Sequence, residues 1–180
     1  MTEIPPLATP LAAAVAQPVL RRLDQELFDR VAAEARRRPR LRCNHNLHQP
    51  DDPVQRFLNV LQPGTYVRPH RHCRDQPGAG FECFLVLQGA IGLLLLDDAG
   101  AVQALQRLEA AGPLRGIELK EGFFHTLVAL TADAVMFELK QGPYSPTTDK
   151  DFLPGFPLEG TPEAQRQERI WCQLFASDPP

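Results

Sequence analysis

Short runs rich in apolar residues fill the middle of the chain, separated by glycine, proline and aspartate. The runs fall at 54–61, 81–87, 91–96, 101–108, 116–120, 123–130 and 134–140. Short strands at this regular spacing are typical of a β-sandwich or a small barrel. The clearest predicted hairpin joins 81–87 to 91–96 through Gln88-Gly89-Ala90. The sequence contains no internal repeat, so we expect one barrel rather than two.

A helix is predicted before this region. Asp24 is a suitable N-cap, apolar residues follow it at helical intervals, and Pro39 ends the segment. The three arginines before Pro39 lie in the last turn, where cations complement the helix dipole. We interpret this basic cluster as a solvated helix end, with an anion site as the alternative.

A second helix is predicted near the C-terminus. It begins after Thr161, a suitable cap, with Pro162 at the first helical position. Its apolar stripe comprises Ile170, Trp171, Leu174 and Phe175. We expect the stripe to pack on the core, and a homodimer contact is the alternative.

The sequence predicts a mainly β protein in which one helix precedes the barrel strands along the chain and another follows them. Residues 1–18 are expected to form a flexible arm, 19–160 the barrel with its preceding helix, and 161–180 a helix and tail packed on the same domain. A polar loop at 73–80, rich in glycine and proline, is expected to be flexible and to act as a lid.

Composition narrows the function classes. A chain of 180 residues with 43% hydrophobic residues suffices for one domain with a sizeable core. Its net charge of −3 argues against a general nucleic-acid or membrane-surface binder. The four cysteines have no CxxC spacing, which favours free thiols in a reducing cytoplasm. The apolar stretch at 7–19 is interrupted by prolines and lacks a basic start, so we expect neither a signal peptide nor a membrane span.

Candidate chemistry begins with His70 and His72. Two histidines one residue apart on an extended segment project from the same face, and neutral imidazole is a common ligand of transition metals. Further ligands would have to come from other strands. Glu82 and His125 each lie in an otherwise apolar run, and a carboxylate in such a run is costly to bury without a cation or hydrogen-bond partners.

At these positions the chain resembles the cupins. The first cupin motif is matched by Gly64, His70, His72, Glu82 and Gly89, with a longer gap than usual between His72 and Glu82. The end of the second motif is matched by Gly122 and His125. Lys120 and Ala129 stand where that motif usually has proline and asparagine.

Residues 40–151 more specifically resemble the WbuC-type cupin-fold metalloproteins. This resemblance rests on Asn44-His45-Asn46-Leu47-His48, Asp52-Pro53-Val54-Gln55-Arg56, Asn59-Val60-Leu61-Gln62-Pro63-Gly64, Gly142-Pro143-Tyr144 and Thr148-Asp149-Lys150-Asp151. That family is associated with bacterial O-antigen gene clusters. The resemblance implies a single cupin, that is, a jelly-roll barrel, and a bound metal, but no particular reaction.

The predicted metal site is His70, His72, Glu82 and His125. Three nitrogens and one oxygen suit one divalent transition metal, such as iron, manganese, nickel or zinc, better than magnesium or calcium. A coordination position left open by the protein would hold water or substrate.

Several side chains are candidates for the surroundings of the metal. The parity of the histidines places Arg68 and Tyr66 on the same side of the strand, provided that Pro69 introduces no bulge. We predict Arg68 and Arg56 as anion clamps and His48 or Tyr66 as acid/base groups. The resemblance adds Asn46 and His48 as pocket-lining residues, and Lys140 and Tyr144 as substrate contacts. His45, on the opposite face from these, is expected to be structural or exposed.

Two functional classes remain open. The first is a metal-dependent enzyme, such as an isomerase, epimerase or dioxygenase, that acts on a small polar or anionic substrate such as a sugar derivative. The second is a non-catalytic cupin that binds a metal or a small ligand as a sensor or store. The fold does not decide between them, because cupins serve both purposes. His48 as an acid/base group would favour the enzyme.

Overall fold

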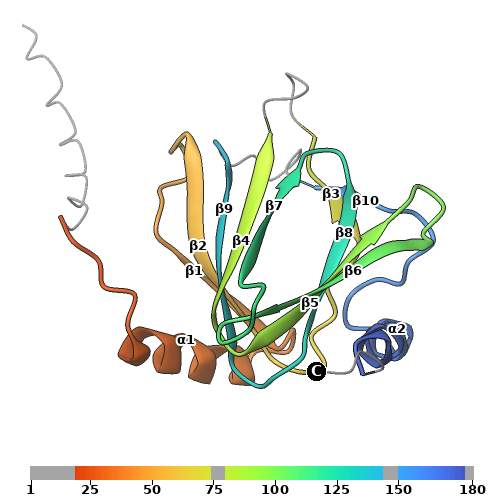
Figure 1. Ribbon diagram of the computed structural model, residues 1–180, viewed down its shortest axis with the longest axis horizontal. Coiled ribbons are helices and arrows are strands. Elements are labelled where there is room, and N and C mark those ends of the chain that lie inside the picture. Colours follow the sequence, from red (N-terminus) through yellow and green to blue (C-terminus); the bar gives the residue numbers. More distant parts are fainter. Residues whose placement is uncertain (1–18, 74–79, 144–149, 177–180) are drawn as a thin grey trace, which may run out of the picture.

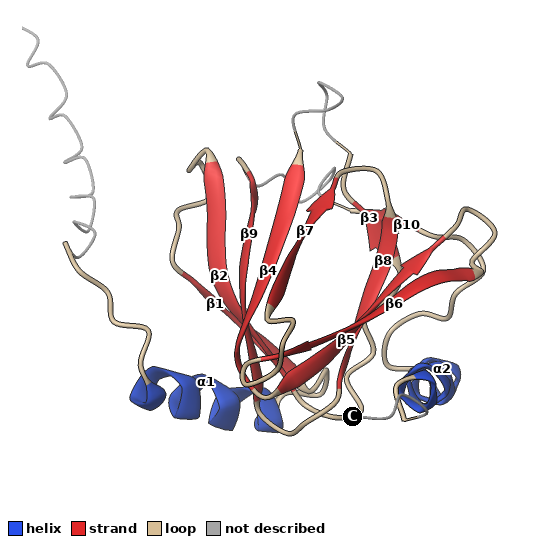
Figure 2. Ribbon diagram, in the orientation of Figure 1, coloured by secondary structure: helices blue, strands red, loops and turns tan. Residues whose placement is uncertain are grey.

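Two antiparallel five-stranded sheets face each other in the computed structural model, which describes residues 19–73, 80–143 and 150–176 (Figures 1 and 2). The first sheet has the order β1-β2-β9-β4-β7 and the second the order β10-β3-β8-β5-β6. The strands of the first sheet are β1 (Arg42–Asn46), β2 (Val54–Leu61), β4 (Phe81–Gln88), β7 (Gly116–Lys120) and β9 (Ala134–Gln141). Those of the second are β3 (His70–Arg71), β5 (Ala90–Leu96), β6 (Val102–Glu109), β8 (Phe124–Ala129) and β10 (Asp151–Phe152). The mainly β prediction is confirmed.

The predicted hairpin between 81–87 and 91–96 is wrong. β4 pairs with β7 and β9, whereas β5 pairs with β6 and β8, so these consecutive strands lie in opposite sheets. Gly89, between them, has a φ of 70°, which is why its position suits glycine. A short connection that changes sheets has the same turn residues as a hairpin, so sequence pattern alone could not distinguish the two. The hairpin partner of β5 is β6.

The first helix, α1 (Gln25–Arg37), packs on the outer face of the first sheet. The carboxylate of Asp24 accepts a hydrogen bond from the backbone N–H of Leu27, which confirms the predicted cap. The buried stripe of α1 forms one apolar cluster with Cys43, Leu58 and Val60 of the sheet. Among the arginines of the last turn, Arg36 pairs with Asp133, which ties the end of the helix to the barrel.

The second helix, α2 (Pro162–Leu174), packs beside the second sheet and is capped by Thr161 as predicted. Its buried Glu168 accepts a hydrogen bond from the backbone N–H of Gly64, at 3.1 Å. Trp171 and Phe175 join the core, whereas Ile170 is 52% exposed and Leu174 38% exposed. Only half of the predicted stripe therefore packs on the domain.

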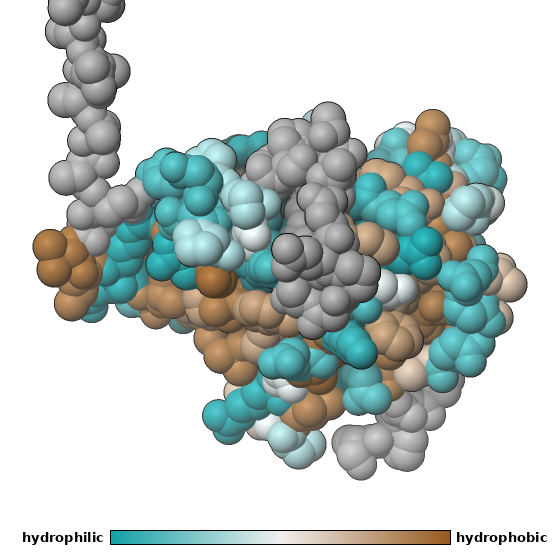
Figure 3. Space-filling model, turned by 90° about the horizontal axis from the view of Figure 1, so that it is seen from above, coloured by the Kyte–Doolittle hydropathy of each residue, from teal (hydrophilic) through white to brown (hydrophobic). Residues whose placement is uncertain are grey.

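The core between the sheets is apolar. It includes Leu61, Phe84, Val86, Ile91, Leu93, Leu127 and Met136, all buried and contributed by strands of both sheets. Figure 1 shows both helices toward one end of the molecule and β3, which carries His70, toward the other. Seen from above, that other end carries many hydrophilic side chains, with apolar ones in patches between them (Figure 3).

Several expectations lie outside the described residues. They are the arm at 1–18, most of the lid at 73–80, Tyr144 and the last residues of the tail. The division of the chain at 18 and 160 stays a prediction. Among the described helices, none is long and apolar enough to cross a membrane.

Candidate metal centre

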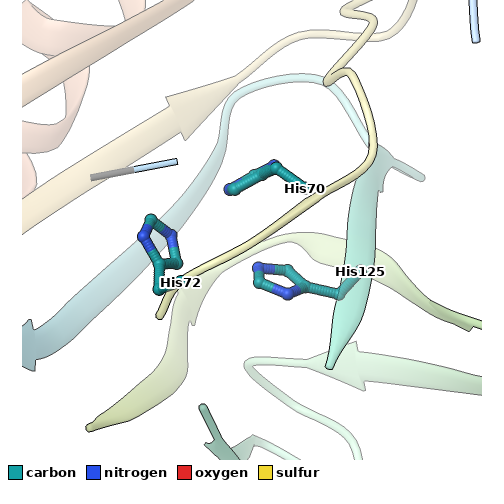
Figure 4. A group of neighbouring side chains, drawn as sticks. All are labelled: His70, His72 and His125. Atoms are coloured by element: carbon teal, nitrogen blue, oxygen red, sulfur yellow. The ribbon is translucent and has the colours of Figure 1, made fainter. Parts of the chain in front are cut away.

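Three buried imidazoles meet between the sheets. His70, His72 and His125 each offer one ring nitrogen, and these nitrogens lie within 4.8 Å of one another. His70 on β3 is directly paired with His125 on β8, and His72 follows β3 by one residue. Figure 4 shows the three rings turned toward one another from these two neighbouring segments. The His-x-His spacing therefore places both rings on one side of the chain, as predicted.

Backbone carbonyls fix how two of these rings present their nitrogens. Nδ1 of His70 lies 2.9 Å from the carbonyl oxygen of Arg68, and Nδ1 of His125 lies 3.0 Å from that of Phe123. A carbonyl oxygen can only accept, so Nδ1 carries the proton in both rings and Nε2 keeps its lone pair. Hydrogen bonding of this kind orients histidine ligands in metal sites.

Glu82 on β4 approaches the histidines from the opposite sheet. Its Oε1 lies 3.1 Å from Nε2 of His72, and its Oε2 lies 3.2 Å from Nε2 of His125. Two ligands about 2.1 Å from one metal are about 3.0 Å apart at a right angle and about 3.4 Å apart at the tetrahedral angle. The spacing of these donor atoms therefore suits ligands of a common transition metal.

Burial determines the charge state of the cluster. It lowers the pKa of His70 well below its usual value and also lowers that of His125, so both rings are neutral near pH 7. Burial acts against the charge of Glu82, but His125, His72 and Lys140 outweigh it and lower the pKa of this carboxyl. Neutral imidazoles beside a carboxylate are the protonation states in which these groups bind metals.

Lys140 is brought close to this cluster. It lies on β9 directly opposite Glu82 on β4, and it is only 4% exposed. Its Nζ is 5.9 Å from the centre of the Phe57 ring. This buried lysine is one of the groups that lower the pKa of the Glu82 carboxyl.

Glu138 was missed by the sequence analysis. It is 7% exposed and shares the inner face of β9 with Lys140, two residues away. Burial raises the pKa of its carboxyl, and the charge of Glu82 adds to this effect. The parity of Lys140 in the predicted strand at 134–140 could have identified it.

Arg68 is linked to His70 through the ring of Phe152. Its guanidinium carbon is 4.9 Å from the centre of the Phe152 ring, and that ring is 6.1 Å from the His70 ring. Nε of Arg68 is shielded from water and has no hydrogen-bond partner among the described residues. A shielded donor without a partner is unusual in a native protein and is consistent with a site for an anion.

Tyr66 does not join the cluster. Its ring stacks on Trp171 of α2, with 5.5 Å between ring centres, and its hydroxyl donates to the carbonyl of Pro157. Val67 instead belongs to the core between the sheets. The parity argument failed here because 65–69 is not a regular strand, so alternation cannot be extended backwards from His70.

Three further candidates, Asn46, His48 and Arg56, lie at the β1 side of the first sheet, on β1, just after it and on β2. β1 is three strands away from β4 in the sheet order, or about 14 Å across the sheet at the usual strand spacing. Asn46 is exposed and, with the half-buried His45, lines a surface cavity of about 610 Å³. A position away from the cluster was expected for His45 but not for Asn46. Nδ1 of His48 lies 3.0 Å from the backbone nitrogen of Arg56. The exposed Arg56 side chain pairs with Asp52.

The fold and the buried histidines define a cupin-like sandwich with a possible metal site. Residues 23–108, just under half of the chain, match the model of a family described as a domain of unknown function, DUF6016. No curated protein matches the chain.

Several solved structures match the chain at low sequence identity. CapF with the inhibitor 3-isopropenyl-tropolone matches with a TM-score of 0.50 and 17% identity, over 62% of this chain and 34% of CapF. KdgF from Halomonas sp. matches with a TM-score of 0.43 and 21% identity, over 58% of this chain and 82% of KdgF. L-ribose isomerase from Cellulomonas parahominis matches with a TM-score of 0.46 and 17% identity, over 61% of this chain and 62% of the isomerase. The chain thus spans about a third of CapF, and the likeness to CapF establishes the fold alone.

Proposed function

We propose that this chain is a cupin metalloprotein of the WbuC type that binds one divalent transition metal through His70, His72, Glu82 and His125. The observation that carries the proposal is the approach of both Glu82 oxygens to within 3.2 Å of two imidazole nitrogens that belong to a buried cluster of three histidines. The three-nitrogen, one-oxygen donor set fits iron, manganese, nickel or zinc.

The protein's own residues account for how such a metal would be held. The carbonyls of Arg68 and Phe123 keep Nδ1 protonated in His70 and His125, so that Nε2 of each faces the metal position. When bound, the metal supplies Lewis-acid polarisation of a coordinated oxygen. Burial of the cluster keeps bulk water from competing with a ligand for that position.

Positive charge near the cluster supports an anionic ligand. Lys140 lies opposite Glu82. Arg68, which has a shielded donor, lies over the Phe152 ring, and that ring is 6.1 Å from the His70 ring. We infer that the protein is a metal-dependent enzyme acting on a small anionic substrate. The proposal that this substrate is sugar-derived and belongs to O-antigen or related polysaccharide metabolism rests on the resemblance to the WbuC-type proteins.

The four free thiols support a cytoplasmic location.

Metal analysis tests the site. The protein purified without chelator should hold about one equivalent of a transition metal, and His70→Ala and His125→Ala should each lose most of it, because each removes a proposed ligand. His48→Ala is the matched control, since His48 is a histidine of the sheet edge outside the cluster. Full metal content in both cluster variants would refute the site.

Calorimetry with inorganic phosphate tests whether the site binds an anion through Arg68. Arg68→Met should weaken phosphate binding to the metal-loaded protein by about tenfold, because it removes a charge-assisted hydrogen bond while keeping an apolar stem of similar length. Arg56→Met is the control, because Arg56 is exposed and paired with Asp52. Equal phosphate affinity in the wild type and both variants would remove Arg68 from the site.

A further inference from the structure

Glu138 is a buried carboxyl group that the proposed metal site does not use. Nδ2 of Asn59 donates to its Oε2 at 3.3 Å, and this is its one hydrogen bond among the described residues. No described side chain donates a hydrogen bond to its other oxygen, Oε1, and Oε1 is not one of the fully shielded atoms without a partner. Burying a carboxyl with one amide partner is unfavourable for stability, and such groups are rare unless they serve a purpose.

The strand register places this carboxyl beside the proposed ligands. Glu138 on β9 pairs with Phe84 on β4, and Lys140 pairs with Glu82. Glu82 and Glu138 are therefore diagonal neighbours on one face of an antiparallel pair, a relation in which Cα atoms lie about 7–8 Å apart. Side chains two residues apart on a strand share a face, so Glu138, Lys140 and Glu82 all project between the sheets.

A purely structural role explains Glu138 poorly. Its cross-strand neighbours on both sides are Phe57 and Phe84, which offer no hydrogen bond to a carboxyl. The next inward-facing residue of β9 is Met136, which is fully buried in the apolar core. An apolar residue at 138 would continue that core, so the carboxyl is better explained by a ligand than by packing.

We propose that Glu138 recognises a hydroxyl group of a ligand held at the metal, through a hydrogen bond to Oε1. Ionised or protonated, a carboxyl oxygen can bond to a hydroxyl group. The inference rests on the proposed function and specifies the ligand further. The ligand carries an anionic group and a neighbouring hydroxyl, as α-hydroxy acids and sugar acids do.

Glycolate and acetate are the probes that test this inference, because they differ only by one hydroxyl group. Calorimetry on zinc-loaded protein gives the ratio of the two affinities. Glu138→Met, which keeps the volume but removes the oxygens, should lower the preference for glycolate over acetate by about tenfold. Glu138→Gln, which keeps a hydrogen-bonding group, should restore part of the preference.

Glu118→Met is the matched control, since Glu118 is exposed on β7 of the same sheet. Zinc content and circular dichroism, recorded for every variant, establish that each is folded and loaded. A wild-type protein that holds zinc without preferring glycolate, or a Glu138→Met variant with the wild-type preference, overturns the role of Glu138 alone. A folded wild-type protein that takes up none of iron, manganese, nickel or zinc overturns the metal site itself.

Discussion

The two ends of the space between the sheets are built from the same strands but differ in chemistry. At one end the inward-facing residues of β4, β8 and β9 are Glu82, His125 and Lys140 with Glu138. Two to four residues further along the same strands, the same face carries Val86, Leu127 and Met136 of the apolar core. We call the first group of residues the polar end and the second the apolar end.

This difference separates stability from function within one fold. The apolar end stabilises the fold by burying large side chains against one another. The polar end buries charged groups, which is unfavourable unless they are paired or bind a cation. Because each strand serves both ends, moving along it by a few residues exchanges one role for the other. Substitutions at matched positions of one strand should therefore have opposite effects.

Met136 and Glu138 give the strongest contrast, because they lie two residues apart on one face of β9. Met136→Glu should destabilise the protein by about 3–5 kcal/mol, since it leaves an unpaired charge in the apolar core. The reverse exchange, Glu138→Met, should leave stability within about 1 kcal/mol or increase it, because loss of the Asn59 hydrogen bond is offset by relief of a buried carboxyl.

Urea unfolding of metal-free protein in the presence of chelator measures both effects on one scale. Thermal unfolding by circular dichroism is an independent check. Similar destabilisation by the two exchanges would contradict the division into ends and make Glu138 an ordinary part of the packed core.

Much of this arrangement was predictable from local pattern. Strand positions followed from short apolar-rich runs between turn residues, and both helix caps from Asp24 and Thr161. The spacing of the motifs predicted that His70, His72 and His125 would form one cluster, and the fold brings them together.

Other features depend on tertiary structure that the sequence pattern does not contain. Whether β5 pairs with β4 or crosses to the other sheet depends on packing, and both alternatives need the same turn at Gly89. The position of Tyr66 depends on Trp171, more than 100 residues away in the chain. Arg56 and His48 are ordinary polar residues of a sheet edge, which alternation alone could not distinguish from pocket residues.

The pH dependence of stability should carry the signature of the polar end. Burial lowers the pKa of His70 well below the value of about 6.5 for an unfolded chain. As pH falls below about 6.5, the unfolded state therefore binds a proton that the folded state does not, and the free energy of unfolding decreases. In metal-free protein this histidine should contribute up to about 1.4 kcal/mol per pH unit, and His125, whose pKa is also lowered, should add to it.

His70→Phe should remove the contribution of His70, so unfolding in urea between pH 7.5 and 5.5 should show a shallower loss of stability than in the wild type. The measurement is made with chelator, because a bound metal would add its own pH dependence. Equal slopes in the two proteins would mean that His70 is as easily protonated in the folded chain as in the unfolded one. Water would then reach His70 at the polar end, whereas the apolar end is dry. The two ends would differ in their access to water and not only in the charges that they bury.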